Sequence, residues 1–158
     1  MMFPKKILTF LTFLIVSLSS IVKVHSIEPD IFVQSTVNRA AKTLSGDFTK
    51  DERIEMLKEI AKDTVDINGI GLYTLGVYRK GLNEDQIENY KILFEQYFLK
   101  SFSSRLAEYS NPEIEVISKK EISKNYTMVY SKLVGTDQRP EVKIDWRIYT
   151  KNVNDPKI

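Results

Sequence analysis

Residues 83–109 read NEDQIENYKILFEQYFLKSFSSRLAEY, and this stretch decides the fold. Asn83 can cap the start of a helix and Gln86 can complete a capping box, while no glycine or proline follows until Pro112. Wound as a helix, the stretch is apolar and largely aromatic over most of its circumference, whereas a surface helix has an apolar stripe only a little wider than about 100°. We therefore expect contact with apolar material on more than one side. The helix is either the centre of a layered core or one wall of a cavity for an apolar ligand.

Three shorter helices are predicted before this stretch. Residues 32–44 carry apolar side chains at helical spacing, and Thr49 and Glu52 form the capping box of a second helix. Asp66 caps a third helix over residues 67–78, which has almost no charge before its end. We expect this third helix to be buried nearly all round.

The periodicity changes to strict alternation after Pro112. Three strands are predicted, beginning near residues 113, 126 and 142, with turn residues between them. In the third strand Val142, Ile144, Trp146 and Ile148 share one face. Four helices followed by an antiparallel sheet predict an α+β domain of two layers. Residues 157–158 read as the start of a fourth strand, without which the third is an open edge.

The N-terminus has the features of a secretory signal peptide. Lys5 and Lys6 precede the apolar run 7–22, which is interrupted by Thr and Ser, and small residues lead to a cleavage site near Ser26. An uncleaved membrane anchor is the alternative, although the apolar core is short for a spanning helix. We expect a signal peptide over residues 1–26 and a single domain with its own core over residues 27–158.

Composition excludes several classes of function. The 158 residues contain 23 Lys and Arg and 21 Asp and Glu, but three of the lysines lie in the signal peptide, which leaves a net charge of −1. A near-neutral surface without a basic cluster argues against nucleic acid as a partner. There is no cysteine, and the one histidine is His25, so the mature chain lacks the nucleophiles and ligands of Ser-His-Asp, Cys-His and usual zinc or copper sites. No catalytic residue, metal or cofactor is predicted.

Several segments resemble one known family. These segments are VDI at 65–67, LGVY at 75–78, YFL at 97–99, SRLAEYS at 104–110 and VKIDWR at 142–147. In order and spacing they resemble the MlaC family, periplasmic phospholipid-binding proteins that are also called the toluene-tolerance auxiliary component of an ABC transporter. Leu72 and Arg79 stand where the family often has an aromatic residue or arginine.

The resemblance implies both a fold and a function. The fold would be an NTF2-like cone, in which N-terminal helices pack against a curved antiparallel sheet and enclose an apolar pocket; the C-terminal strand and helix of the family would be missing after Ile158. The function would be a non-enzymatic phospholipid carrier in the periplasm. Its partners would be an outer-membrane lipoprotein complex and an inner-membrane ABC transporter with an MCE-domain subunit, and its role would be to maintain outer-membrane lipid asymmetry.

Hiding two acyl chains from water demands a deep apolar pocket. The third and fourth helices and the third strand can supply it. The side chains expected to line it are Leu72, Leu75, Tyr78, Phe94, Tyr97, Phe98, Phe102, Met128, Tyr130, Ile144, Trp146 and Ile148. Each of these residues could instead be ordinary core.

Arg105 lies in the aromatic face of the long helix, where an unpaired charge is costly. One interpretation is an ion pair with an acid such as Glu108 or Asp145. The other is contact with a lipid phosphate, which suits the guanidinium fork.

Two other functions compete with the carrier. One is an enzyme that uses Asp145 or a buried tyrosine as acid or base in an apolar pocket, although strand alternation points Asp145 away from the apolar face. The other is a periplasmic interaction module or chaperone of the same fold, in which the apolar residues form core only.

Overall fold

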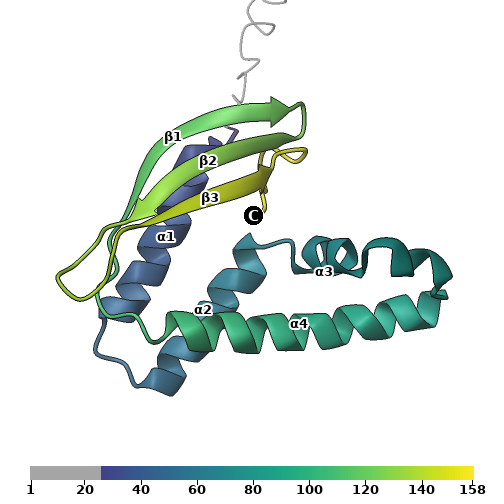
Figure 1. Ribbon diagram of the computed structural model, residues 1–158, viewed down its shortest axis with the longest axis horizontal. Helices are drawn as coiled ribbons and strands as arrows, with labels where there is room; N and C mark the ends of the chain where they lie inside the picture. Colours follow the sequence, from purple (N-terminus) through teal and green to yellow (C-terminus); the bar gives the residue numbers. More distant parts are fainter. Residues whose placement is uncertain (1–25) are drawn as a thin grey trace, which may run out of the picture.

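The computed structural model describes residues 26–158, so nearly all of the predicted signal peptide lies outside the described part. The helices and strands follow in the predicted order (Figure 1). They are α1 (Pro29–Ser45), α2 (Lys50–Thr64), α3 (Ile67–Leu75), the short 3-10 helix η1 (Gly76–Gly81), α4 (Glu84–Leu106), β1 (Ile114–Ser123), β2 (Tyr126–Leu133) and β3 (Val142–Tyr149).

The helix caps predicted from the sequence are confirmed. The Asn83 side chain accepts a hydrogen bond from the backbone N–H of Gln86 at 2.8 Å, and the Gln86 side chain accepts one from the Asn83 N–H at 3.0 Å. Thr49 and Glu52 make the same reciprocal pair at α2, and the Asp66 carboxylate caps α3. These bonds satisfy backbone donors that a helix start otherwise leaves unpaired. They fix where three of the helices begin.

One face of the sheet packs against α1. The strands are antiparallel in the order β1-β2-β3, and Val129 pairs with Trp146 while Thr127 pairs with Ile148. Val129 and Ile148 are fully buried together with Val33 of α1. Burial of an aliphatic side chain of this size contributes about 1.5–3 kcal/mol. This cluster joins the first helix to the sheet.

Helix α2 is the support on which α4 lies. Leu57 of α2 is buried beside Ala107, just after α4, and Ala61 of α2 is buried beside Leu99 of α4 and Ile67 of α3. The helices therefore have their own apolar clusters, separate from the one beneath the sheet.

Helices α3 and η1 form a helical hairpin with α4. A Cβ added to Gly71 would lie 2.8 Å from the Phe94 ring, so only glycine permits this spacing. Gly76 has a φ of +54° and ends α3. The prediction that residues 67–78 are buried nearly all round is wrong, because only one side of α3 packs against α4 and Tyr73 and Tyr78 are 84% and 79% exposed.

The helical hairpin lies beside the β3 edge of the sheet (Figure 1). Helix α4 packs against α2 and α3, while the sheet packs against α1, and within residues 26–158 α4 has no extensive contact with a strand. The α+β class with an antiparallel sheet is confirmed. The expected closed pocket is instead open in the described chain, because the two layers stand apart along β3.

Residues 157–158 connect the two layers at one end. Lys157 and Tyr149 exchange backbone hydrogen bonds of 2.7 and 3.1 Å, so Lys157 pairs with β3 as the predicted fourth strand would. Ile158 then donates to the Thr64 carbonyl at 2.8 Å and accepts from the Asp66 N–H at 3.0 Å. The corner between α2 and α3 is thereby tied to the sheet.

Candidate functional site

A groove separates α3 from the end of β3. It has a volume of about 580 Å³, and its walls are mainly aromatic and aliphatic with three charged side chains. The lining residues are Asp66, Gly69, Ile70, Tyr73, Tyr126, Asp145, Trp146, Arg147, Tyr149 and Ile158. We call it the α3–β3 groove.

A second hollow lies at the opposite end of β3. It has a volume of about 720 Å³ and is formed by the C-terminal half of α4 and the turn between β2 and β3. The lining residues are Tyr97, Ser101, Ser104, Arg105, Glu108, Tyr109 and Arg139. We call it the α4–turn hollow, and we call it and the α3–β3 groove together the trough. A further hollow of about 450 Å³ lies between α1 and β1, away from both.

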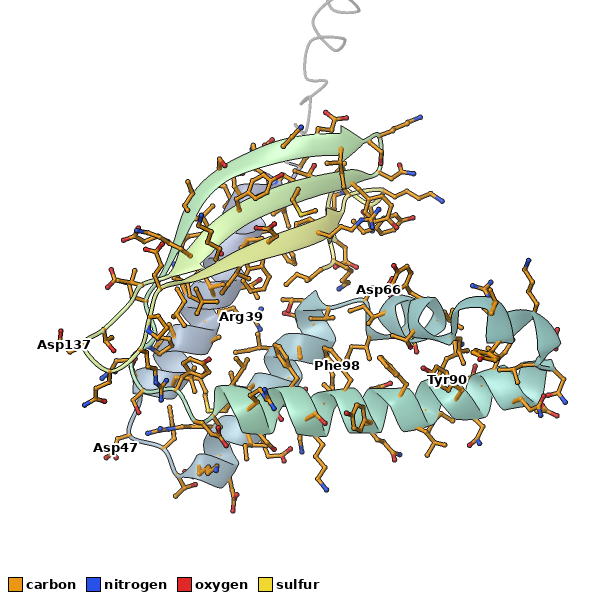
Figure 2. The ribbon with its side chains drawn as sticks, viewed as in Figure 1. Arg39, Asp47, Asp66, Tyr90, Phe98 and Asp137 are labelled. Atoms are coloured by element: carbon orange, nitrogen blue, oxygen red, sulfur yellow. The ribbon has the colours of Figure 1, made fainter. Side chains whose placement is uncertain are left out.

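A row of stacked rings runs along α4. Tyr90, Phe94, Phe98 and Phe102 have successive centroid distances of 5.8, 6.2 and 5.3 Å. Figure 2 labels Tyr90 and Phe98 in this row. Phe94 and Phe98 are half-buried against the Ala61, Ile67 and Leu99 cluster, so this row is partly core. Tyr97, on another side of the helix, is 70% exposed.

The residues predicted to contact lipid fall in different parts of the molecule. Tyr97, Arg105 and Trp146 line the trough. Five residues on the helical hairpin are partly buried or at the margin of burial, namely Leu72, Leu75, Phe94, Phe98 and Phe102. Tyr78 lies exposed on η1, and Ile144 is half-buried on the Trp146 face of β3.

Three further predicted residues lie away from the trough. Ile148 is completely buried between the sheet and α1. Met128 pairs with Arg147, and Tyr130 pairs with Asp145, so both side chains are on the sheet face opposite Trp146. The prediction treated all of them as one lining. The register of β2 places Met128 and Tyr130 on the other face, whereas Ile148 shares the Trp146 face and is covered by α1.

Several residues of the trough were not predicted. Ile70 and Tyr73 come from α3, and Tyr149 and Ile158 come from the other side of the groove. The one sequence signal was the unbroken apolar character of α3, which was interpreted as burial. Arg139 lies in a turn and carried no signal.

Two arginines of the trough stack on aromatic rings. The Arg147 guanidinium lies 4.6 Å from the centre of the Tyr126 ring, and that of Arg139 lies 4.7 Å from the centre of the Tyr109 ring. Arg105 is exposed, and within residues 26–158 it forms no ion pair with Glu108 or Asp145. The ion-pair interpretation of Arg105 is therefore wrong for the described chain.

Two further features bear on the competing functions. The described residues bring together no group of three or more His, Cys, Asp or Glu side chains that could hold a metal ion. Among the helices of residues 26–158, none has the length and apolar character needed to cross a membrane.

Comparisons with known proteins give a family and a fold. The MlaC protein family matches residues 33–158. A solved structure of a phospholipid-binding protein from Ralstonia solanacearum, in complex with a phospholipid, superimposes with a TM-score of 0.68 at 14% sequence identity, over 83% of this chain and 75% of that one. No significant match is found among curated proteins.

Proposed function

The chain belongs to the MlaC protein family, and from this membership we propose that it binds a phospholipid in the trough and carries it between membranes. The phospholipid held by the structurally similar Ralstonia protein supports the proposal. The carrier would work in the periplasm, after removal of the signal peptide near Ser26. It would need no cofactor and perform no catalysis, since the phospholipid is its cargo.

One observation carries this proposal. Apolar and aromatic side chains of α3 and of the β3 edge line a groove that neither layer fills, and within residues 26–158 no strand packs extensively against α4. Tyr73 in this groove and Tyr97 in the α4–turn hollow are largely exposed, and Trp146 is only half-buried. Large contiguous apolar surfaces on soluble proteins mark binding sites for ligands, partners or membranes.

The physical demand of carrying a lipid is large. At about 0.8 kcal/mol per buried CH₂, two ordinary acyl chains have a gross transfer free energy of about 20 kcal/mol. A groove and a hollow of about 580 and 720 Å³ fall in the range of sites that enclose ligands of moderate size. Covering both acyl chains would require the helical hairpin to move toward β3, and the absence of extensive α4–strand packing leaves room for that motion.

The proposed partners follow from the family. We assign lipid exchange to an outer-membrane lipoprotein complex on one side and an inner-membrane ABC transporter with an MCE-domain subunit on the other. This traffic would maintain the lipid asymmetry of the outer membrane and thereby tolerance of solvents such as toluene. Arg105, which has no carboxylate partner in the described chain, is the proposed contact for the lipid phosphate.

A second function is favoured by the exposed tip of the helical hairpin. Val77 and Tyr78 of η1 are exposed and lie outside both parts of the trough. Such side chains would also suit a periplasmic interaction module or chaperone that binds a protein and carries no lipid. The two functions differ in whether lipid accompanies the protein.

Native mass spectrometry of protein purified from the periplasm without detergent tests the proposal. We expect a fraction of the molecules to carry one or more phospholipids, which solvent extraction then releases. Protein that is consistently free of lipid and does not take up phospholipid from vesicles would contradict the carrier and favour the interaction module.

A further inference from the structure

Arg139 is held in a defined position by the turn between β2 and β3. The Thr136 N–H donates to the Arg139 carbonyl at 2.8 Å, and the Arg139 N–H donates to the Thr136 carbonyl at 3.1 Å. One guanidinium nitrogen, Nη2, lies 3.5 Å from the Glu108 carbonyl oxygen, and the group stacks on Tyr109. An arginine has five N–H donors, and within residues 26–158 the Arg139 guanidinium donates to one acceptor, so most of its donors can bind another.

The α4–turn hollow has an excess of positive charge. Arg105 and Arg139 approach it from two elements, and Glu108 is the one carboxylate among its lining residues. Within residues 26–158 neither arginine has a carboxylate within ion-pair distance. The hydroxyls of Ser101 and Ser104 line the same hollow. Two guanidinium forks and two hydroxyls form a set of donors suited to a phosphate.

The α3–β3 groove and the α4–turn hollow share no lining residue and differ in character. The α3–β3 groove is lined by Ile70, Tyr73, Trp146 and Ile158, whereas the α4–turn hollow is lined mainly by polar and cationic side chains. β3 has eight residues and so spans about 26 Å between them. One leaflet of a bilayer has about 15 Å of hydrocarbon, half of a core of about 30 Å. With its headgroup region, one leaflet is about 20–22 Å thick, half of a bilayer of about 40–45 Å. A phospholipid with its phosphate in the α4–turn hollow would therefore extend most of the way along β3 toward the α3–β3 groove.

We propose that Arg139 and Arg105 bind the phosphate of the cargo in the α4–turn hollow, so that the lipid lies with its headgroup there and its acyl chains toward the α3–β3 groove. This inference rests on the proposed function. It adds a second phosphate ligand, Arg139, and a fixed direction for the cargo along β3.

A competition between two lipids with the same acyl chains tests this proposal. Delipidated protein is incubated with a dispersion of equal amounts of dioleoylphosphatidylglycerol and dioleoylglycerol, reisolated, and its bound lipids are quantified by mass spectrometry. We expect the full chain to prefer the phosphate-bearing lipid. Arg139→Gln and Arg105→Gln should each reduce this preference by about two- to fivefold, because contacts of exposed charges are weak. Retention of dioleoylglycerol should not change.

Controls separate the possible outcomes. Arg39→Gln changes an exposed residue of α1 outside the trough, and it should keep the full preference for the phosphate-bearing lipid. Arg139→Lys keeps the charge but loses the guanidinium fork, so its preference should lie between those of the parent and Arg139→Gln. Both lipids bound without discrimination, or a preference unchanged in Arg139→Gln and Arg105→Gln, would overturn this proposal alone. Binding of neither lipid would overturn the proposed function. Loss of the preference for phosphatidylglycerol in excess inorganic phosphate would support the two arginines as the phosphate site, because free phosphate and the headgroup would compete for the same donors.

Discussion

Gly71 sets the distance between α3 and α4. The Phe94 ring occupies the space where any other residue would place its Cβ, and Phe94 also contacts the cluster of Ala61, Ile67 and Leu99. The sequence showed the glycine but not its neighbour, because the contact joins residues 23 positions apart whose pairing depends on the whole hairpin.

Gly71→Ala should lower the free energy of unfolding by about 1 kcal/mol. Overpacking costs about 1–3 kcal/mol, which the better helix propensity of alanine, about 1 kcal/mol, offsets in part. Gly81→Ala is the matched control, since a Cβ there meets nothing within 4 Å, and it should change stability by no more than about 0.5 kcal/mol. Chemical denaturation measures both variants. A Gly71→Ala protein as stable as the parent would show that Phe94 yields without cost.

The Asp30–Lys119 contact joins the start of α1 to β1 at 2.7 Å, and Lys119 also contacts Glu28 at 2.6 Å. The hydrogen bond from Lys119 is the main reason that the pKa of Asp30 is lower than its ordinary value of 3.8. A lowered pKa in the folded state stabilises the fold at pH values above 3.8, and that contribution disappears as the pH falls through the folded pKa. The stability of the parent should therefore fall toward that of Asp30→Asn below about pH 4.

Denaturation of the parent and of Asp30→Asn at neutral and at acid pH measures this convergence. In a Lys119→Met background, Asp30→Asn should no longer change the stability at neutral pH, because the partner of the Asp30 carboxylate is gone. A gap between parent and Asp30→Asn that stays constant from neutral pH down to pH 3 would contradict the assignment.

At the scale of elements, local hydrogen bonding was predictable and burial was not. The capping pairs at α2 and α4 involve residues three apart, so the sequence contains both partners. In β2 both faces carry residues that favour strands, and the larger ones, Met128 and Tyr130, were expected to face the ligand. The α1 side takes the smaller Thr127, Val129 and Ser131, which allow a helix to lie close against the sheet.

In the helical hairpin, we expect different residues to determine the stability of the fold and the retention of lipid. Leu99→Ala should lower the free energy of unfolding by about 2–4 kcal/mol, since Leu99 is buried in the cluster that joins α4 to α2 and α3. Tyr73→Ser with Tyr97→Ser removes two exposed rings and should change stability by no more than about 0.5 kcal/mol each.

The same double variant should retain about three- to tenfold less phospholipid, because it loses aromatic surface for the acyl chains. Thermal unfolding and lipid quantification on the same samples check the two results together. Unchanged lipid retention in the double variant, with a normal fold, would place the cargo elsewhere.

At the scale of the whole molecule, the α+β fold class was predictable from the sequence. Whether the helical layer and the sheet close over a pocket was not. The order of helices and strands, and the family that residues 33–158 match, agree with the pattern in the sequence. Whether two apolar surfaces pack together or stand apart depends on the angle at which the hairpin leaves α2. Ile158 bonds to Thr64 and Asp66 at the α2–α3 corner, and buried clusters join α2 to α4. These contacts join residues far apart in the sequence, so no local pattern encodes them.

Trp146 gives the most direct test of the central claim that acyl chains lie in the trough. It is the one tryptophan of the chain, it lines the α3–β3 groove, and its indole N–H donates to Ser131 at 2.7 Å. Phospholipid with brominated acyl chains should quench Trp146 fluorescence strongly on binding, while the same lipid without bromine should not. Binding of the brominated lipid, shown by mass spectrometry on the same sample, with no quenching of Trp146 would contradict the account.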